Sequence, residues 1–433
     1  MLNDNAKVPP MLTIVRNIDV IDGTGSAPLR DRTVVIEDRH IRSVEESRWN
    51  GAADLEIDGR GKTLLPGLMD MHIHLNIPAS PYEADKYDMK LSNKSSALGA
   101  LYSIDNARDL IARGVTTVRD VGAHGHGIFA LKQLIDQGRT VGPRIYSCGR
   151  GINMTGGHGP RLCVAADGAD AVRHQTRKQM MAGAEIIKFM ASGAAAEAWE
   201  SPYDVHLTEA EMAAGVQEAH ARGATTAAHA VNPQSIINSV NAGIDSIEHG
   251  VLADEPALKL MLEREVHLVP TIWTFQMLAS QGTVIGMEDW FMKEIAKRVE
   301  THLEVVSLAH KMGIQLAVGT DSALPVNVAA SVIWEMQWLI HCGLTNLEAI
   351  RAATLNGAQL LEIEDKVGTI APGMLADILV VDGDPSVDIQ HLHNVDVVIR
   401  AGSILVKKGK IVDPHGRMIS DPNNPPDGPY PPQ

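Results

Sequence analysis

The sequence is poor in cysteine and in aromatic residues. Its 433 residues include three cysteines, 6 Trp, 6 Tyr and 4 Phe. Three cysteines cannot form an even disulfide framework, and the spacing of Cys148, Cys163 and Cys342 matches no zinc-finger pattern. A disulfide-stapled or zinc-finger domain is therefore excluded, and any metal site must be built from histidine and carboxylate side chains.

Excess positive charge and long apolar runs are also lacking. The 38 Lys and Arg against 53 Asp and Glu give a formal net charge of −15, which argues against nucleic acid as a partner because such proteins carry a basic surface. No stretch approaches the roughly 18 apolar residues of a membrane span, and the N-terminus lacks a signal-peptide pattern. We therefore expect no nucleic acid, no membrane and a cytoplasmic location.

The two ends of the chain share a β-like pattern. Residues 34–44 alternate loosely between apolar and polar side chains, and short apolar runs separated by turns return near the C-terminus. The pattern predicts a small β-sandwich domain made from residues 1–65 and 366–420, with a larger domain, 66–365, inserted between the halves. The Pro-rich end, 421–433, is expected to be a tail.

In the inserted domain, short apolar strands alternate with helical stretches such as 170–184, 208–223 and 288–313. Eight such units favour an α/β fold of the (β/α)8 TIM-barrel type. An open doubly wound sheet is the alternative, but no GxGxxG or P-loop follows a strand. The expected strands are residues 68–75, 115–122, 144–149, 185–192, 225–230, 246–250, 267–272 and 314–322.

His72 and His74 stand at the end of the first expected strand. Residues i and i+2 of a strand point to the same face, so the two imidazoles can bind one metal ion. Asp321 ends the last strand and should face the same carboxyl-terminal rim, where barrel enzymes carry their chemistry. It could be a metal ligand and accept a proton from a bound water, or it could cap a loop.

His229 and His249 end two further apolar strands. A single histidine in such a place is often a core residue. Two histidines on successive strands, both at the carboxyl ends, favour a second set of metal ligands, since neutral imidazole is a common one.

Lys188 lies inside the apolar strand EIIKFM. A buried ammonium is costly unless it is paired or neutral. One interpretation is a snorkelling lysine or an ion pair with Glu185. The other is a lysine that has reacted with carbon dioxide, because its carbamate is anionic and could bridge two divalent metal ions.

These residues resemble the ligand set of the amidohydrolase superfamily, in the binuclear branch with a carboxylated lysine. The resemblance covers nearly the whole chain. Within the superfamily the chain looks like the subgroup of Xaa-Pro dipeptidase-like, carboxypeptidase-like and ochratoxin-degrading amidohydrolases. The runs that carry it are GKTLLPGLMDMHIHL, GVTTVRD, TGGHG, EIIKFMASG, AAHA, IEHG, GTDS and ATLNGAQLL.

The resemblance implies two divalent metal ions, for which zinc suits the ligands. N6-carboxylated Lys188 would bridge both ions together with a hydroxide. The ligands implied for the individual ions are His72, His74 and Asp321 for the first, and His229 and His249 for the second.

His158, in TGGHG, matches a substrate-binding and catalytic histidine near the scissile carbonyl, although a solvent-exposed loop histidine is the alternative. Asp321 would move a proton from the hydroxide to the leaving amine. Several relatives carry a tyrosine shortly before the helix that follows strand four. Here Leu207 or His206 stands there and Tyr203 lies upstream, so that route of carboxylate recognition is not expected.

The leading function is hydrolysis of a C-terminal amide or peptide bond in a small N-acyl amino acid or dipeptide, such as ochratoxin A cleaved to ochratoxin α and phenylalanine. The alternatives are a cyclic-amide hydrolase or deaminase on the same barrel, and a non-enzymatic scaffold. Lys188 argues against a mononuclear deaminase, and the complete ligand set argues against a scaffold. The resemblance also implies a homo-oligomer, often an octamer.

Overall fold

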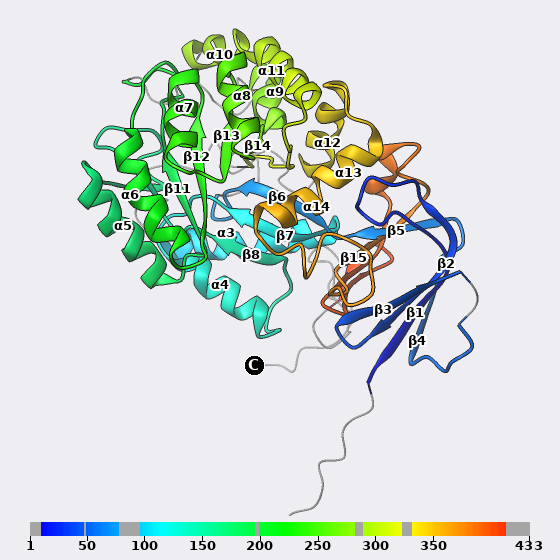
Figure 1. Ribbon diagram of the computed structural model, residues 1–433. Coiled ribbons are helices and arrows are strands. Elements are labelled where there is room, and N and C mark those ends of the chain that lie inside the picture. The colour runs from blue at the N-terminus through cyan, green and yellow to red at the C-terminus, as the bar shows by residue number, and fades with distance from the viewer. Residues whose placement is uncertain are drawn as a thin grey trace, which may run out of the picture.

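The computed structural model describes residues 10–46, 49–77, 96–194, 199–281, 289–322 and 331–412. They form a barrel of parallel strands with helices around it, and a β-rich domain beside the barrel (Figure 1). The predicted fold class is confirmed. None of the helices in the described ranges combines the length and the apolar character that a membrane crossing requires.

The β-rich domain is a nine-stranded mixed sheet built from both ends of the described chain. β5 joins the two halves, because it pairs in parallel with β1 and antiparallel with β15. In Figure 1 the blue N-terminal strands and the orange C-terminal segment accordingly lie side by side. The strands are β1 (Leu12–Val20), β2 (Leu29–Glu37), β3 (His40–Glu45), β4 (Leu55–Asp58), β5 (Lys62–Pro66), β15 (Ile378–Asp382), β16 (Val395–Arg400), β17 (Ser403–Lys407) and β18 (Lys410–Ile411).

The barrel strands fall into two parallel sheets, β6-β7-β8 and β10-β9-β11-β12-β13-β14. Between β8 and β11, the Glu185 amide donates to the Ser147 carbonyl at 3.2 Å. The strands are β6 (Leu68–Ile73), β7 (Val115–Asp120), β8 (Arg144–Ser147), β9 (Gly151–Asn153), β10 (Cys163–Ala165), β11 (Ile186–Met190), β12 (Thr225–Ala230), β13 (Ser246–His249) and β14 (His267–Val269).

Residues 314–322 fill the gap between β14 and β6, as expected of the eighth strand, but they do not form a regular strand. The segment is held by isolated bridges from Leu316 to Leu268 and from Ser322 to Ile73. A left-handed backbone at Asp321, with φ of 50°, interrupts the ladder. Gly319 is needed here, because a Cβ would lie 2.3 Å from Val269 Cγ1 and 3.0 Å from the His72 amide nitrogen.

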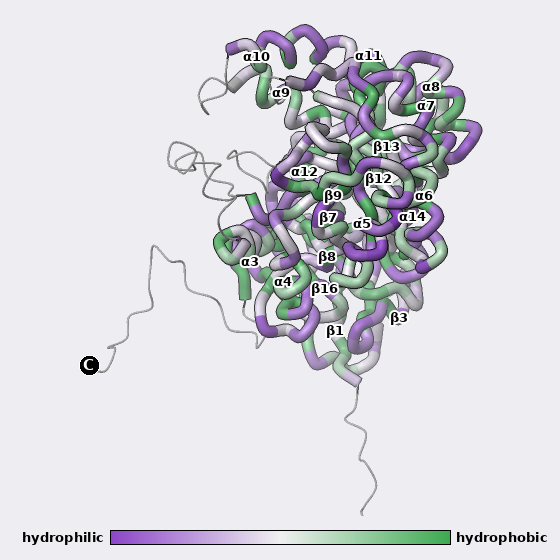
Figure 2. The backbone as a smooth tube through the Cα atoms, turned by 90° about the vertical axis from the view of Figure 1, so that its left-hand side faces the viewer, coloured by the Kyte–Doolittle hydropathy of each residue, from purple (hydrophilic) through white to green (hydrophobic). Residues whose placement is uncertain are grey.

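The helices alternate with the strands and lie outside them (Figure 1). Their hydropathy varies along each helix (Figure 2), as expected where one face packs on the strands and the other meets solvent. The expected helix at 288–313 is two helices, because the chain breaks around Arg298. The helices are α3 (Ser96–Ala112), α4 (Gly127–Asp136), α5 (Ala169–Ala182), α6 (Glu209–His220), α7 (Pro233–Asn241), α8 (Glu255–Glu263), α9 (Ile272–Gln281), α10 (Asp289–Ala296), α11 (Val299–Met312), α12 (Ser331–His341), α13 (Asn346–Ala352), α14 (Leu355–Leu360) and the 3₁₀ helix η2 (Ile389–His393).

A partly buried ion pair ties the barrel to the β-rich domain. Arg144 on β8 contacts Asp377, which precedes β15, at 2.6 Å. The division of the chain after residues 65 and 365 stays a prediction, and the expected tail at 421–433 lies outside the described residues.

Candidate active site

Histidine side chains from three strand ends meet at the carboxyl-terminal rim of the barrel. Parallel strands place their carboxyl ends at one rim, so β6, β12 and β13 bring distant residues together. The distances between successive ring centroids are 5.5 Å for His74 and His72, 4.9 Å for His72 and His249, 4.6 Å for His249 and His229, and 4.2 Å for His229 and His158.

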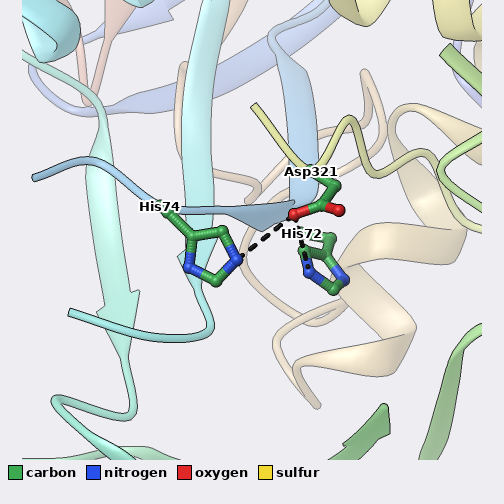
Figure 3. Close-up of side chains that lie close together, drawn as sticks. All are labelled: His72, His74 and Asp321. Carbon is green, nitrogen blue, oxygen red and sulfur yellow. Dashed lines mark ion pairs between the residues drawn. The ribbon is translucent and has the colours of Figure 1, made fainter. Parts of the chain in front are cut away.

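His72, His74 and Asp321 form a compact group with the spacing of a metal site (Figure 3). Asp321 Oδ1 lies 3.4 Å from Nε2 of His72 and 3.2 Å from Nε2 of His74. One ligand atom of each residue lies within 4.8 Å of the others. Both histidines are buried, so water can do little to screen the group.

The hydrogen bonds at the far side of each ring decide which nitrogen faces Asp321 with a lone pair. His74 Nδ1 lies 2.8 Å from the Gly122 carbonyl, and His72 Nδ1 lies 2.6 Å from the Glu248 carboxylate. Carbonyl and carboxylate oxygens accept, so each Nδ1 carries the proton and donates. In the neutral rings Nε2 then presents a lone pair to another acceptor, Asp321, which is unfavourable unless a positive charge lies between them.

That positive charge can be a second proton or a metal ion. Burial opposes protonation of His74, but the Asp321 carboxylate outweighs it and raises the pKa of the imidazole. Burial would raise the pKa of Asp321, yet His72 and His74 hold it well below its usual range. An ionised carboxylate with two Nε2 atoms is a donor set that fits a divalent cation.

Three rim residues that are not glycine have a left-handed backbone: His249 with φ of 71°, Thr271 with 56° and Asp321 with 50°. Such conformations persist where the surroundings enforce them, and they cluster at functional sites. For Asp321, the amide donates to the His72 carbonyl at 2.7 Å, and the Thr274 hydroxyl donates to the Asp321 carbonyl at 3.0 Å. The strand end is thereby bent so that the carboxylate meets the histidines.

His229 and His249 form a second pair of neutral imidazoles. The Thr271 hydroxyl donates to the Pro270 carbonyl at 2.7 Å, so it accepts from Nδ1 of His249, also at 2.7 Å. This leaves Nε2 of His249 with a lone pair. Among the described residues, Nε2 of His229 has no hydrogen-bond partner. Burial holds the pKa of both histidines well below the usual value, as a metal-binding imidazole requires.

Lys188 on β11 is 1% exposed, so it does not snorkel to solvent. Within the described part of the chain its Nζ has no hydrogen-bond partner. Glu185, the alternative partner, instead pairs with Lys132 at 3.1 Å. Burial lowers the pKa of Lys188, which favours the neutral amine that can react with carbon dioxide.

His158 lies against this group and is not a free loop residue. Its ring stacks on His229, and its Nδ1 lies 2.9 Å from Oε1 of the buried Glu200. Its backbone amide donates to Nδ1 of His206 at 3.3 Å. Tyr203 is largely exposed and Leu207 is fully buried.

Three neighbours of these histidines were not singled out from the sequence: Arg119, Glu200 and Glu248. Glu248 directly precedes His249 on a buried strand, so an acidic residue in an apolar run was the available signal. Arg119 gave a similar signal in β7. Glu200 lies in a loop, where hydrophobic periodicity does not predict which side chains are buried.

Comparison with known proteins assigns the chain to a family. Residues 63–412 match the Amidohydrolase family. Ochratoxinase from Aspergillus niger is 29% identical, over 97% of this chain and 90% of that protein. A solved amidohydrolase structure has a TM-score of 0.84 at 31% identity, covering 92% of this chain and 99% of the other.

Two further solved structures agree with this assignment. A Xaa-Pro dipeptidase with methionine bound in its active site has a TM-score of 0.83 at 29% identity, covering 91% of this chain and 99% of that one. The A. niger ochratoxinase structure has a TM-score of 0.83 at 26% identity, covering 94% and 98%. The resemblance found in the sequence is confirmed: the chain belongs to the amidohydrolase family and is a hydrolase of C–N bonds.

Proposed function

We propose that the chain is a binuclear metal-dependent amidohydrolase that releases the C-terminal residue of small N-acyl amino acids or dipeptides. The observation that carries the proposal is the donor set at one rim: two pairs of imidazoles, one ionised carboxylate and a buried lysine amine without a described partner. The similarity to ochratoxinase and to a Xaa-Pro dipeptidase supports the substrate class. Ochratoxin A, cleaved to ochratoxin α and phenylalanine, is one candidate.

Each donor has a place in the proposed site. His72, His74 and Asp321 would hold the first ion, His229 and His249 would hold the second, and carboxylated Lys188 would be a ligand of both. When bound, the ions would polarise the scissile carbonyl and lower the pKa of a water molecule toward neutrality. Zinc suits imidazole and carboxylate ligands of this kind.

Lys188 acquires its negative charge in one step. The lone pair of the neutral amine attacks carbon dioxide, a C–N bond forms, and one proton leaves to solvent. The product is a carbamate anion, so a residue that is costly to bury as a cation becomes a ligand. The low dielectric around Lys188 favours the neutral amine before the reaction.

Asp321 transfers the proton and His158 donates a hydrogen bond to the oxyanion in the proposed reaction. Asp321 is ionised, so it can accept a proton from the attacking water and pass it to the nitrogen of the leaving amine. Oε1 of Glu200 accepts the hydrogen bond from Nδ1 of His158, so Nε2 can donate to the developing oxyanion only in the doubly protonated, cationic ring. The buried Glu200 carboxylate balances that charge, and one such donor is worth about 3–4 kcal/mol.

The test is turnover of a substrate panel by zinc-loaded protein, with amino acid release as the measurement. The panel contains N-acyl amino acids, dipeptides and ochratoxin A, with a cyclic amide as the comparison. We expect cleavage of linear amides, about two zinc ions per chain, and loss of activity after chelation. Absence of linear amide hydrolysis across the panel would overturn the proposal, and absence of bound metal would favour a scaffold. Assembly into a homo-oligomer stays a prediction for sedimentation analysis.

A further inference from the structure

An ion pair lies fully buried inside the barrel, next to the proposed first metal site. Nη2 of Arg119 on β7 lies 2.7 Å from Oε1 of Glu248 on β13, and both side chains are 0% exposed. Removing two charges from water costs about as much as their attraction returns. A gain in stability therefore does not explain why this pair lies in the barrel interior. The groups that the pair contacts indicate its role instead.

Those contacts join three strands. The Ser246 hydroxyl also donates to Glu248 Oε1, at 2.6 Å, and Oε2 accepts from Nδ1 of His72 at 2.6 Å. Arg119 donates from Nη1 to the Ser246 hydroxyl at 2.9 Å and from Nε to the Met71 carbonyl at 2.5 Å. The guanidinium thus holds both the carboxylate and the backbone directly before His72.

We infer that Arg119 and Glu248 form a positioning unit for His72, which keeps its proton on Nδ1 and its Nε2 lone pair toward the first metal ion. This inference rests on the proposed function. Oε1 already accepts from two donors, so Oε2 remains for His72. Because a carboxylate can only accept, the tautomer of the ring is fixed.

Glu248 also links the two halves of the proposed site. It contacts His72 on β6 and directly precedes His249 on β13. A shift of the Glu248 backbone would therefore move ligands of both ions together. The Arg119–Glu248 unit therefore sets the orientation of His72 relative to β13, the strand that carries His249.

The test compares Glu248→Gln with Asp377→Asn. In E248Q the side-chain amide can donate to Nδ1 of His72, which moves the ring proton to Nε2 and blocks ligation. D377N is the matched control, because it also removes a buried carboxylate from an arginine pair, with the partly buried Arg144, at the contact between the two domains. Zinc binding is measured by dialysis against chelator-buffered zinc, and folding by circular dichroism and thermal midpoint.

We expect both variants to lose thermal stability, while only E248Q needs roughly 10–100-fold more free zinc for half occupancy. Wild-type zinc affinity in E248Q, or an equal shift in D377N, would overturn the positioning role. A wild-type protein that binds no zinc would instead overturn the proposed function.

If E248Q does not fold, Arg119→Lys tests whether the unit positions His72. This variant keeps the charge balance inside the barrel but lacks the planar fork that joins Glu248, Ser246 and Met71. We expect weaker zinc binding in R119K as well. Unchanged zinc affinity in a folded R119K protein would count against the unit.

Discussion

Nε2 of His74 lies 3.2 Å from Oδ1 of Asp321, although the His74 proton is on the opposite nitrogen, which donates to the Gly122 carbonyl. Two acceptors therefore face each other in a buried place. Such a contact is unfavourable unless a second proton or a metal ion lies between the two atoms, so loss of the Asp321 carboxylate should weaken the binding of that positive charge.

Asp321→Asn should lower kcat/KM for a linear amide by roughly 10²–10⁴-fold, because the amide can neither accept the proton nor balance the cation. Zinc content per chain should fall as well. Metal analysis and steady-state kinetics provide the check, with Asp365→Asn as the control, since Asp365 is exposed on the surface. A D321N protein within tenfold of the wild type would contradict the role.

Lys188→Met should separate stability from metal binding. The variant removes an amine that is buried without a described partner, so the metal-free protein should unfold at the same or a higher temperature than the wild type. Zinc binding should weaken by at least the roughly 10–100-fold typical of outer-shell changes. Carbon NMR with isotope-labelled bicarbonate should show a carbamate signal in the wild type alone. Full activity and full metal content in K188M would rule out the bridging role.

Glu200→Gln should lower kcat more than it changes KM. Glu200 holds Nδ1 of His158 at 2.9 Å, and without the carboxylate the charged ring is no longer balanced. The loss should stay below the roughly 10²–10³-fold expected for removing an oxyanion donor outright. Glu211→Gln is the control, because Glu211 contacts Thr208 and Gly168 at a helix start. Equal effects of both variants would speak against a role for Glu200.

Acid should destabilise the metal-free protein through His267. Burial, followed by the nearby Arg119, lowers the pKa of His267 to about 4, whereas an unfolded histidine titrates near 6.5. The unfolded state therefore binds the proton first as the pH falls from about 6.5 to 4, and stability drops, by about 2 kcal/mol at pH 5. Thermal midpoints at pH 7 and 5 should differ less in His267→Gln than in the wild type.

His220→Gln tests a histidine whose pKa is raised by folding, so its effect on the pH dependence of stability is opposite to that of His267. Asp245, at 2.9 Å, raises the pKa of His220, so this histidine stabilises the fold at low pH and loses that effect as the pH rises through its folded pKa. H220Q should therefore lose more stability than the wild type between pH 7 and 5. A smaller loss of stability in H220Q than in H267Q would contradict at least one of the two assignments.

The histidines at the rim could be predicted from the sequence, but the residues that orient them could not. His72 and His74 were predictable because a strand repeats every two residues and a barrel gathers its strand ends. Glu248 meets His72 only through the register of β13 and the curvature of the barrel. The left-handed turn at Asp321 also depends on contacts with Thr274 and His72, which lie far away in the sequence.

The pairing of β5 with β15 has a consequence for synthesis on the ribosome. Lys62 on β5 and Asp396 on β16 are 334 residues apart, yet they form an ion pair. At about 5–20 residues per second, translation takes roughly 15–70 s to reach the C-terminal strands after β5 has emerged. During that interval one edge of β5 has no partner, and exposed strand edges pair readily with other chains. The speed at which the barrel is translated therefore sets how long each nascent chain is open to aggregation.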